Sequence, residues 1–253
     1  MEDLIAIHGL DAFRDVLSAC SLPCIVGRAA AASEAAGSWL GGYPMIDDGF
    51  VWPIKDDRPL GFVGQLLCQD IGMDRAGYLL FFYDEEHHGF ALSDAGGFAV
   101  VHQHGERLLE EADLPVVHSK TLGLFRRASR PKVWARTPIV FDAGLSYDGD
   151  AAYEALNYEL DDADRLFAFC ADAVHHIQVA GIASPANTDY QSDACVVCAE
   201  MLGVEPSDCV LLLQLHSAHG MMWGDVGSLC WYIRRADLAA GNFTDAWMLM
   251  TCS

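Results

Sequence analysis

One pattern occurs twice in this chain: an apolar strand containing a glutamine, a loop, a glycine and an aromatic-rich strand. In the first copy FVGQL precedes GYLLFF, and Gly77 stands 12 residues after Gln65. In the second copy LLLQL precedes GSLCWY, and Gly227 stands 13 residues after Gln214. Apolar strands can resemble one another by chance, but the shared glutamine and glycine favour duplication of a unit about 100 residues long. Equivalent glutamines should both be buried, with their amides bonded to nearby backbone.

The remaining pattern predicts an α+β fold. Apolar runs bounded by turn residues predict strands at 60–67, 77–84, 98–102, 114–118, 133–141, 209–217, 227–234 and 245–253. Apolar spacing and helix propensity predict helices at 3–19, 29–36, 150–178 and 189–202, with a short helical turn at 235–238. We expect a single compact domain over residues 1–253, with mixed or antiparallel β-sheets, flanking helices and an internal pseudo-twofold. Its halves are expected at about 38–142 and 143–253, after the N-terminal helix.

The composition limits the cellular setting. Apolar residues make up 52% of the chain, which supplies a sizeable core. The acidic start Met1-Glu2-Asp3 does not look like a secretory signal, and no apolar run reaches the roughly 20 residues that span a bilayer. We therefore expect a cytoplasmic protein whose nine cysteines are free and mostly buried.

The charge points to a class of partner. The chain has 15 basic and 36 acidic residues, a formal net charge of −21. Such a surface disfavours nucleic acid and anionic membranes, whose phosphates attract positive charge. It suits a cationic partner, although many acidic proteins have none. A contact surface for that partner is expected at Asp84, Glu85, Glu86, Asp148, Asp150, Asp161, Asp162 and Asp164.

The segment Trp223-Gly224-Asp225 separates two predicted strands and has two interpretations. Gly224 permits a positive φ and Asp225 can accept hydrogen bonds within its own loop, so a structural turn is favoured. The alternative is that Trp223 and Trp52 lie on equivalent loops and wall a cleft shared by the two halves.

Motifs for metal binding and catalysis are incomplete. Cys195 and Cys198 have the spacing of half a zinc site, but no second pair follows. The histidines, such as His102 with His104, lack a carboxylate at a diagnostic spacing. The sequence also lacks a nucleophile elbow and a phosphate-binding loop. We expect no catalytic residue, metal or cofactor.

Three segments carry a family resemblance. GGYPMIDDGFVWPIKDDRPLGFVGQLL, HHIQVAGIASPANTDYQSDAC and the stretch from LLLQLHS to the C-terminus resemble the signatures of the YwqG-like family, over about residues 38–253. The resemblance implies an α+β domain with an internal pseudo-repeat. It also implies that some members are immunity proteins, because relatives occur beside bacterial toxin genes. The family's function is unknown, so no catalytic residues can be transferred.

Two functions follow as hypotheses. The first is a cytoplasmic immunity protein that binds and neutralises a cationic toxin, most plausibly a nuclease, whose phosphate-binding surface is basic. The alternative is an enzyme or small-ligand-binding protein with a cleft between the halves. A toxin gene beside this one would favour the first, and a metabolic operon the second.

Overall fold

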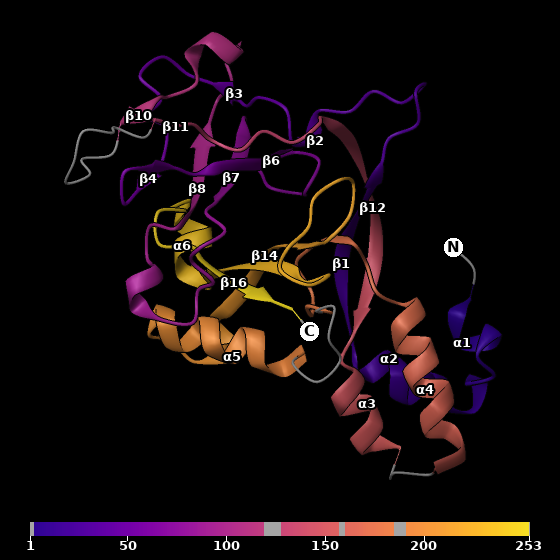
Figure 1. Cartoon of the computed structure of the whole chain (residues 1–253). Helices are drawn as coiled ribbons and strands as arrows, with labels where there is room; N and C mark the ends of the chain where they lie inside the picture. The colour runs from indigo at the N-terminus through magenta and orange to yellow at the C-terminus, as the bar shows by residue number, and fades with distance from the viewer. Residues whose placement is uncertain (1–2, 119–127, 157–159, 185–190, 253) are drawn as a thin grey trace.

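The computed structural model describes residues 3–118, 128–156, 160–184 and 191–252. Its main feature is a ten-stranded sheet in the order β16-β15-β14-β13-β1-β12-β2-β6-β7-β8, in which all neighbouring strands are antiparallel (Figure 1). The strands are β1 Ser21–Ala29, β2 Ser38–Leu40, β6 Gly61–Leu67, β7 Tyr78–Tyr83, β8 Phe98–Gln103, β12 Thr137–Tyr147, β13 Ile177–Val179, β14 Cys209–His216, β15 Ser228–Arg234 and β16 Trp247–Thr251.

The long strands β1 and β12 pair over nine residues at the centre of the sheet. Four strands extend on each side of this pair: β2, β6, β7 and β8 beyond β12, and β13, β14, β15 and β16 beyond β1. We call these the first arm and the second arm. The described residues also form three small two-stranded sheets: β3 Met45–Ile46 with β9 Arg107–Leu108, β4 Ile54–Lys55 with β5 Arg58–Pro59, and β10 Val117–His118 with β11 Ala128–Ser129.

The arms form where the sequence has continuous apolar runs. Strands β6, β7, β14, β15 and β16 are buried along almost their whole length, as expected for strands that are covered on both faces. The sheet curls, so the arms share a core: the rings of Phe81 and Trp231 lie 5.3 Å apart, and those of Phe98 and Trp247 lie 5.0 Å apart. The last pair joins β8 to β16, the two ends of the sheet.

The helices form two groups (Figure 1). One group packs in its own apolar cluster, where Tyr147 at the end of β12 meets Phe169; it comprises α1 Leu4–Ile7, α2 Arg14–Ala19, α3 Gly149–Ala155 and α4 Leu160–Asp172. The other group covers the second arm and comprises α5 Gln191–Leu202 and α6 Arg235–Ala240. Short 3-10 turns occur at Asp11–Phe13, Leu92–Asp94, Glu111–Asp113 and Pro206–Asp208. None of the helices in the described ranges is long and apolar enough to cross a membrane.

The strand predictions for both arms are confirmed, because β6, β7, β8, β14, β15 and β16 lie within one or two residues of their predicted positions. Three helix predictions are wrong. The predicted helix 3–19 is interrupted at Gly9, whose φ of +65° is not helical, and the predicted helix 150–178 is two helices followed by β13. The predicted helix 29–36 is instead an irregular segment that follows β1. The sequence pattern did not predict β1, because this strand forms through pairing with β12, which outweighs local propensity.

Candidate functional site

The segment that joins β7 to β8, residues 84–97, crosses the edge strand β16; we call it the crossing loop. The backbone N–H of Met250 donates to the carbonyl of His88 at 2.9 Å, and the indole Nε1 of Trp247 donates to the carbonyl of Gly89 at 2.8 Å. Gly89 has a φ of +85°, and a Cβ there would lie 1.8 Å from the carbonyl oxygen of Met248. The loop can therefore approach the strand this closely only with glycine at this position.

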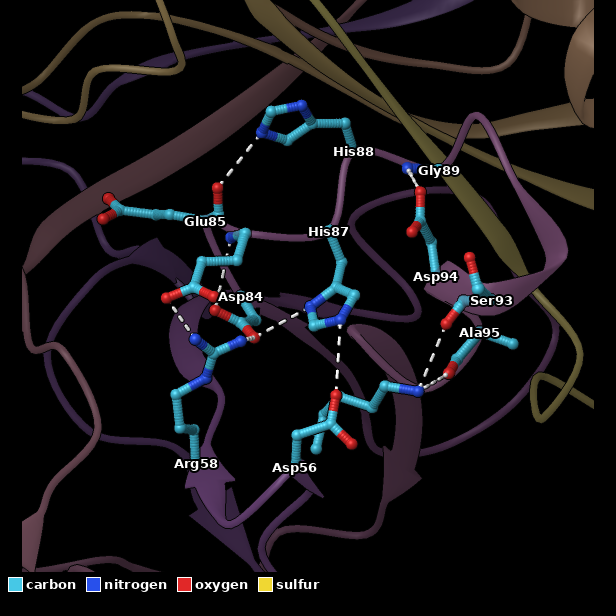
Figure 2. Close-up of polar contacts among 12 residues, drawn as sticks. Asp56, Arg58, Asp84, Glu85, His87, His88, Gly89, Ser93, Asp94 and Ala95 are labelled. Atoms are coloured by element: carbon cyan, nitrogen blue, oxygen red, sulfur yellow. Dashed lines mark hydrogen bonds and ion pairs between the residues drawn. The ribbon is translucent and has the colours of Figure 1, made fainter. Parts of the chain in front are cut away.

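A polar cluster anchors the start of the crossing loop (Figure 2). The Asp84 carboxylate accepts from the Arg58 guanidinium at 2.7 Å and lies 2.9 Å from Nδ1 of His87. The side chains of Asp84 and His87 are each only 13% exposed. Arg58 also forms an ion pair with Glu86, and this hydrogen bond lowers the pKa of Glu86. Lys132 forms an ion pair with Glu85.

The β4–β5 hairpin supplies the other side of this cluster. Asp56 and Asp57 at its tip have φ values of +50° and +59°, the conformation that a tight two-residue hairpin requires. A carboxylate oxygen of Asp56 lies 3.6 Å from Nε2 of His87. Lys55 donates to the carbonyls of Ser93 and Ala95, which ties the hairpin to the crossing loop.

This arrangement fits an anchor for the crossing loop better than a catalytic centre. His87 lies between two carboxylates, which can orient an imidazole, but Ser93 reaches the cluster through its carbonyl rather than its hydroxyl. Within the described ranges, no group of three or more His, Cys, Asp or Glu side chains could hold a metal ion.

Two cavities lie beside the crossing loop. The first, which we call the Arg234 cleft, has a volume of about 510 Å³ and lies between the first arm and the second. Its lining includes Pro53, Ile54, Gly96, Phe98, Leu202, Arg234, Asp245 and Trp247. The second, which we call the Thr251 pocket, has a volume of about 430 Å³ and lies between the crossing loop, α5 and the end of β16.

The two glutamines of the repeated pattern are both fully buried. Oε1 of Gln65 accepts from the backbone N–H of Met45 at 2.7 Å, and Oε1 of Gln214 accepts from that of Ser184 at 2.7 Å. The prediction that both are buried and bonded to nearby backbone is confirmed, but Nε2 of Gln65 has no hydrogen-bond partner among the described residues.

The two predicted wall tryptophans do not meet. Trp52 packs in a cluster with Phe50 and Phe82 and donates its indole N–H to the carbonyl of Leu60 at 2.9 Å. Trp223 packs in the main core, 5.8 Å from the ring of Tyr83. The expectation of one cleft walled by both is wrong, because each indole is buried in a different apolar cluster.

The segment from Trp223 to Gly227 is a turn. The backbone N–H of Gly227 donates to the carbonyl of Trp223 at 2.7 Å, and Gly224 has a φ of +53°. Asp225 is exposed at the tip of this turn. The structural interpretation is therefore confirmed for the backbone of this segment.

The eight predicted partner-binding carboxylates fall into two separate groups. Asp84, Glu85 and Glu86 belong to the polar cluster at the crossing loop, where each contacts a basic side chain. The others lie on or beside α3 and α4, at the opposite end of the molecule (Figure 1). Of these, Asp148 caps α3 by accepting from the backbone N–H of Ala151. Asp150 and Asp164 are exposed. The side chains of Asp161 and Asp162 lie outside the described residues.

Sequence reasoning missed the roles of Arg58 and His87, because their contacts join the β4–β5 hairpin to a loop some 26 residues later. It assigned no role to His216, which the structure places in the core. Nε2 of His216 lies 2.7 Å from Nε2 of Gln214, its Nδ1 lies 3.1 Å from the Ser228 hydroxyl, and burial lowers its pKa to about 4. The nine cysteines are free and five are buried.

Comparison with known proteins gives a family but no function. No curated protein matches the sequence. A family model described as a domain of unknown function (DUF1963) matches residues 38–252, which include every strand of the sheet except β1. Since this match spans most of the chain, the protein belongs to the DUF1963 family.

Proposed function

We propose that this chain is a binding protein that neutralises a basic protein partner, in the manner of an immunity protein. The observation that carries the proposal is the net charge of −21, together with the ion pairs that basic side chains form with carboxylates of the same chain. Arg14, Arg28, Arg58, Arg107, Lys132 and Arg234 each contact carboxylates of the chain itself. A partner therefore meets surplus negative charge, which steers a cationic protein toward the surface.

The α3–α4 group is the better docking surface of the two acidic groups. Asp84 is largely buried against Arg58, so its charge is already compensated. Asp150, Glu154 and Asp164 are exposed. Exposed rim charges mainly raise the rate of association and make it depend on salt. We propose that these carboxylates bind the basic surface of a toxin, a role that the resemblance to YwqG-like proteins suggests. We propose a nuclease because its phosphate-binding surface is basic.

The test uses the protein encoded by the reading frame beside this gene. We expect that protein to be basic, to arrest growth when expressed alone, and to lose this effect when co-expressed with the present chain. The purified pair should form a complex whose association slows as salt is raised. A neighbouring product that leaves growth unchanged, or that fails to bind this chain at low salt, would contradict the proposal.

A second candidate function rests on the Arg234 cleft. Its volume of about 510 Å³ lies in the range of small-molecule sites, and it lies between the two arms. The Arg234 guanidinium is held there by Asp237 at 3.1 Å, Asp245 at 3.2 Å and the carbonyl of Leu202 at 2.9 Å. Ala99 also lines the cleft, so Ala99→Trp should obstruct it. A metabolite that raises the melting temperature of the wild type but not of this variant would favour this function.

We also propose that the two arms arose by duplication. On each side of the central pair, the four strands follow one another outward in chain order. Each glutamine strand also has a shift in register, or β-bulge, just before the glutamine, at Phe62/Gly64 and at Leu211/Leu213. Gln65 lies opposite Trp39 and Gln214 opposite Gln178. Each glutamine accepts from the backbone N–H of the residue six positions after its partner, which is Met45 for Gln65 and Ser184 for Gln214. The sequence-based boundary at 142/143 falls within β12, so the proposed halves begin at β1 and at β12.

A further inference from the structure

The crossing loop lines both the Arg234 cleft, with Ala95 and Gly96, and the Thr251 pocket, with His88 and Phe90. The Thr251 pocket has a volume of about 430 Å³, within the range of small-molecule sites. Its walls come from three segments that are distant in the sequence: α5 with Ala194, Val196 and Val197, β16 with Leu249 and Met250, and the crossing loop with Phe90. A molecule in this pocket would touch the last strand of the second arm and the loop that connects two strands of the first arm.

The walls are apolar and partly open to solvent. Phe90 is 58% exposed and Val196 is 49% exposed, so two large apolar side chains remain in contact with water at the pocket. Among the residues that the structure describes, none that lines the pocket is Asp, Glu, Lys or Arg. A charged ligand would find no counter-ion there, whereas an apolar ligand would remove these side chains from water.

One polar atom in the wall lacks a partner. Thr251 is 7% exposed, and its Oγ1 makes no hydrogen bond to any described residue. A buried hydroxyl without a partner is costly. Oγ1 itself is shielded from solvent, so a ligand bonds to it, and removes that cost, when the Thr251 side chain rotates toward the pocket. The other polar side chain in the wall, His88, already uses Nε2 in a contact with the carbonyl of Glu85 at 3.1 Å (Figure 2).

From these observations we infer that the Thr251 pocket binds a neutral small molecule with an alkyl or aryl body and one hydrogen-bonding group. The body lies against Val196, Val197 and Phe90, and the polar group bonds to Oγ1 of Thr251. This site is independent of the acidic surface, so the binding of a protein partner can fail or succeed without it.

The test uses N-phenyl-1-naphthylamine, a neutral apolar fluorophore with one N–H group, and the full-length protein. We expect saturable fluorescence enhancement with one probe per chain, and displacement of the probe by 1-octanol. Val196→Asp places a charge in the wall and should weaken probe binding at least tenfold. Thr251→Val keeps the shape of the side chain but removes the hydroxyl, and should weaken binding about fivefold.

The matched control is Phe167→Asp. Phe167 is 54% exposed on α4, so this variant adds the same charge to another half-exposed apolar position on a helix. It should bind the probe as the wild type does, and circular dichroism should show that all three variants are folded. The inference is overturned if the wild type does not bind the probe, or if Val196→Asp binds as tightly as Phe167→Asp. Equal affinity of Thr251→Val and the wild type would overturn the role of the hydroxyl.

Discussion

The indole of Trp247 donates its hydrogen bond to the carbonyl of Gly89, 158 positions away in the sequence, and so joins the crossing loop to the last strand. Gly89→Ala should break this junction, because the new methyl group would meet the carbonyl of Met248 at a φ that disfavours alanine. We expect a loss of about 3 kcal/mol or more in the free energy of unfolding, measured by urea denaturation.

Gly49→Ala is the matched control for that variant. Gly49 has the same φ of +85°, but a Cβ there would have nothing within 4 Å. It should cost only the backbone penalty of about 1 kcal/mol. Equal losses in the two variants would show that the close approach at Gly89 does not contribute to stability.

The two buried glutamines should differ in their contribution to stability. Gln65 accepts one hydrogen bond, whereas Gln214 accepts from Ser184, donates to the carbonyls of Ser184 and His175, and contacts His216. Gln65→Leu should therefore cost about 1 kcal/mol and Gln214→Leu about 3 kcal/mol in the free energy of unfolding. The prediction would be contradicted if urea denaturation showed a larger loss in the free energy of unfolding for Gln65→Leu than for Gln214→Leu.

His216 should make the protein less stable in mild acid. Burial lowers its folded-state pKa to about 4, whereas an unfolded histidine titrates near 6.5, so the unfolded chain takes up the proton first. Stability from this residue is present above pH 6.5 and is lost as the pH falls toward 4, by about 3 kcal/mol in total.

The measurement is the free energy of unfolding at several pH values, compared between the wild type and His216→Asn. The variant should lose less stability than the wild type between pH 6.5 and 4, because it lacks this titrating group. An NMR titration of the His216 ring gives an independent check. A ring that becomes protonated near pH 6.5 would contradict the prediction.

Reversal of the exposed acidic residues on α3 and α4 should slow association with a basic partner. The triple variant carries Asp150→Lys, Glu154→Lys and Asp164→Lys. We expect association several-fold slower at low salt and a smaller effect at 1 M salt, where the Debye length is about 3 Å. Thermal stability should change little, since exposed charges contribute little to folding.

A control variant separates the docking surface from the total charge. It carries Asp48→Lys, Glu106→Lys and Glu111→Lys, all exposed and outside α3 and α4, with the same change in net charge. Stopped-flow association at low salt should be slower for the α3–α4 variant than for this control. Equal rates would mean that the net charge, rather than this surface, guides the partner.

The sequence predicted β6, β7, β14, β15 and β16 because these strands are buried along almost their whole length and appear as continuous apolar runs, such as 61–67. It did not predict β1, in which only Cys24 and Gly27 are buried and which begins after a helix-like segment. Its ladder depends on partners in β12 that are distant in the sequence. The periodicity at 3–19 was equally misleading, because apolar spacing continues across the turn at Gly9.

The candidate site was less predictable than the sheet. The burial of Gln65 and Gln214 followed from a repeated pattern in which a polar residue interrupts an apolar strand. The link of Arg58 and Asp84 has no such local signal, because it depends on how the β4–β5 hairpin meets the crossing loop. Asp84 was expected on a docking surface because its neighbours are acidic, but burial and the guanidinium make it part of the anchor.

The central position of β1 affects how the chain folds during synthesis. Each residue of β1 pairs with a residue of β12 that is 110 to 126 positions later. At ribosomal rates of about 5–20 residues per second, β1 waits on the order of 10 seconds for its partner. Such non-local pairing raises the contact order and slows folding. During this interval the first arm has β2 as its unpaired edge, and because this edge is only three residues long it offers little backbone for pairing with another chain until β12 emerges.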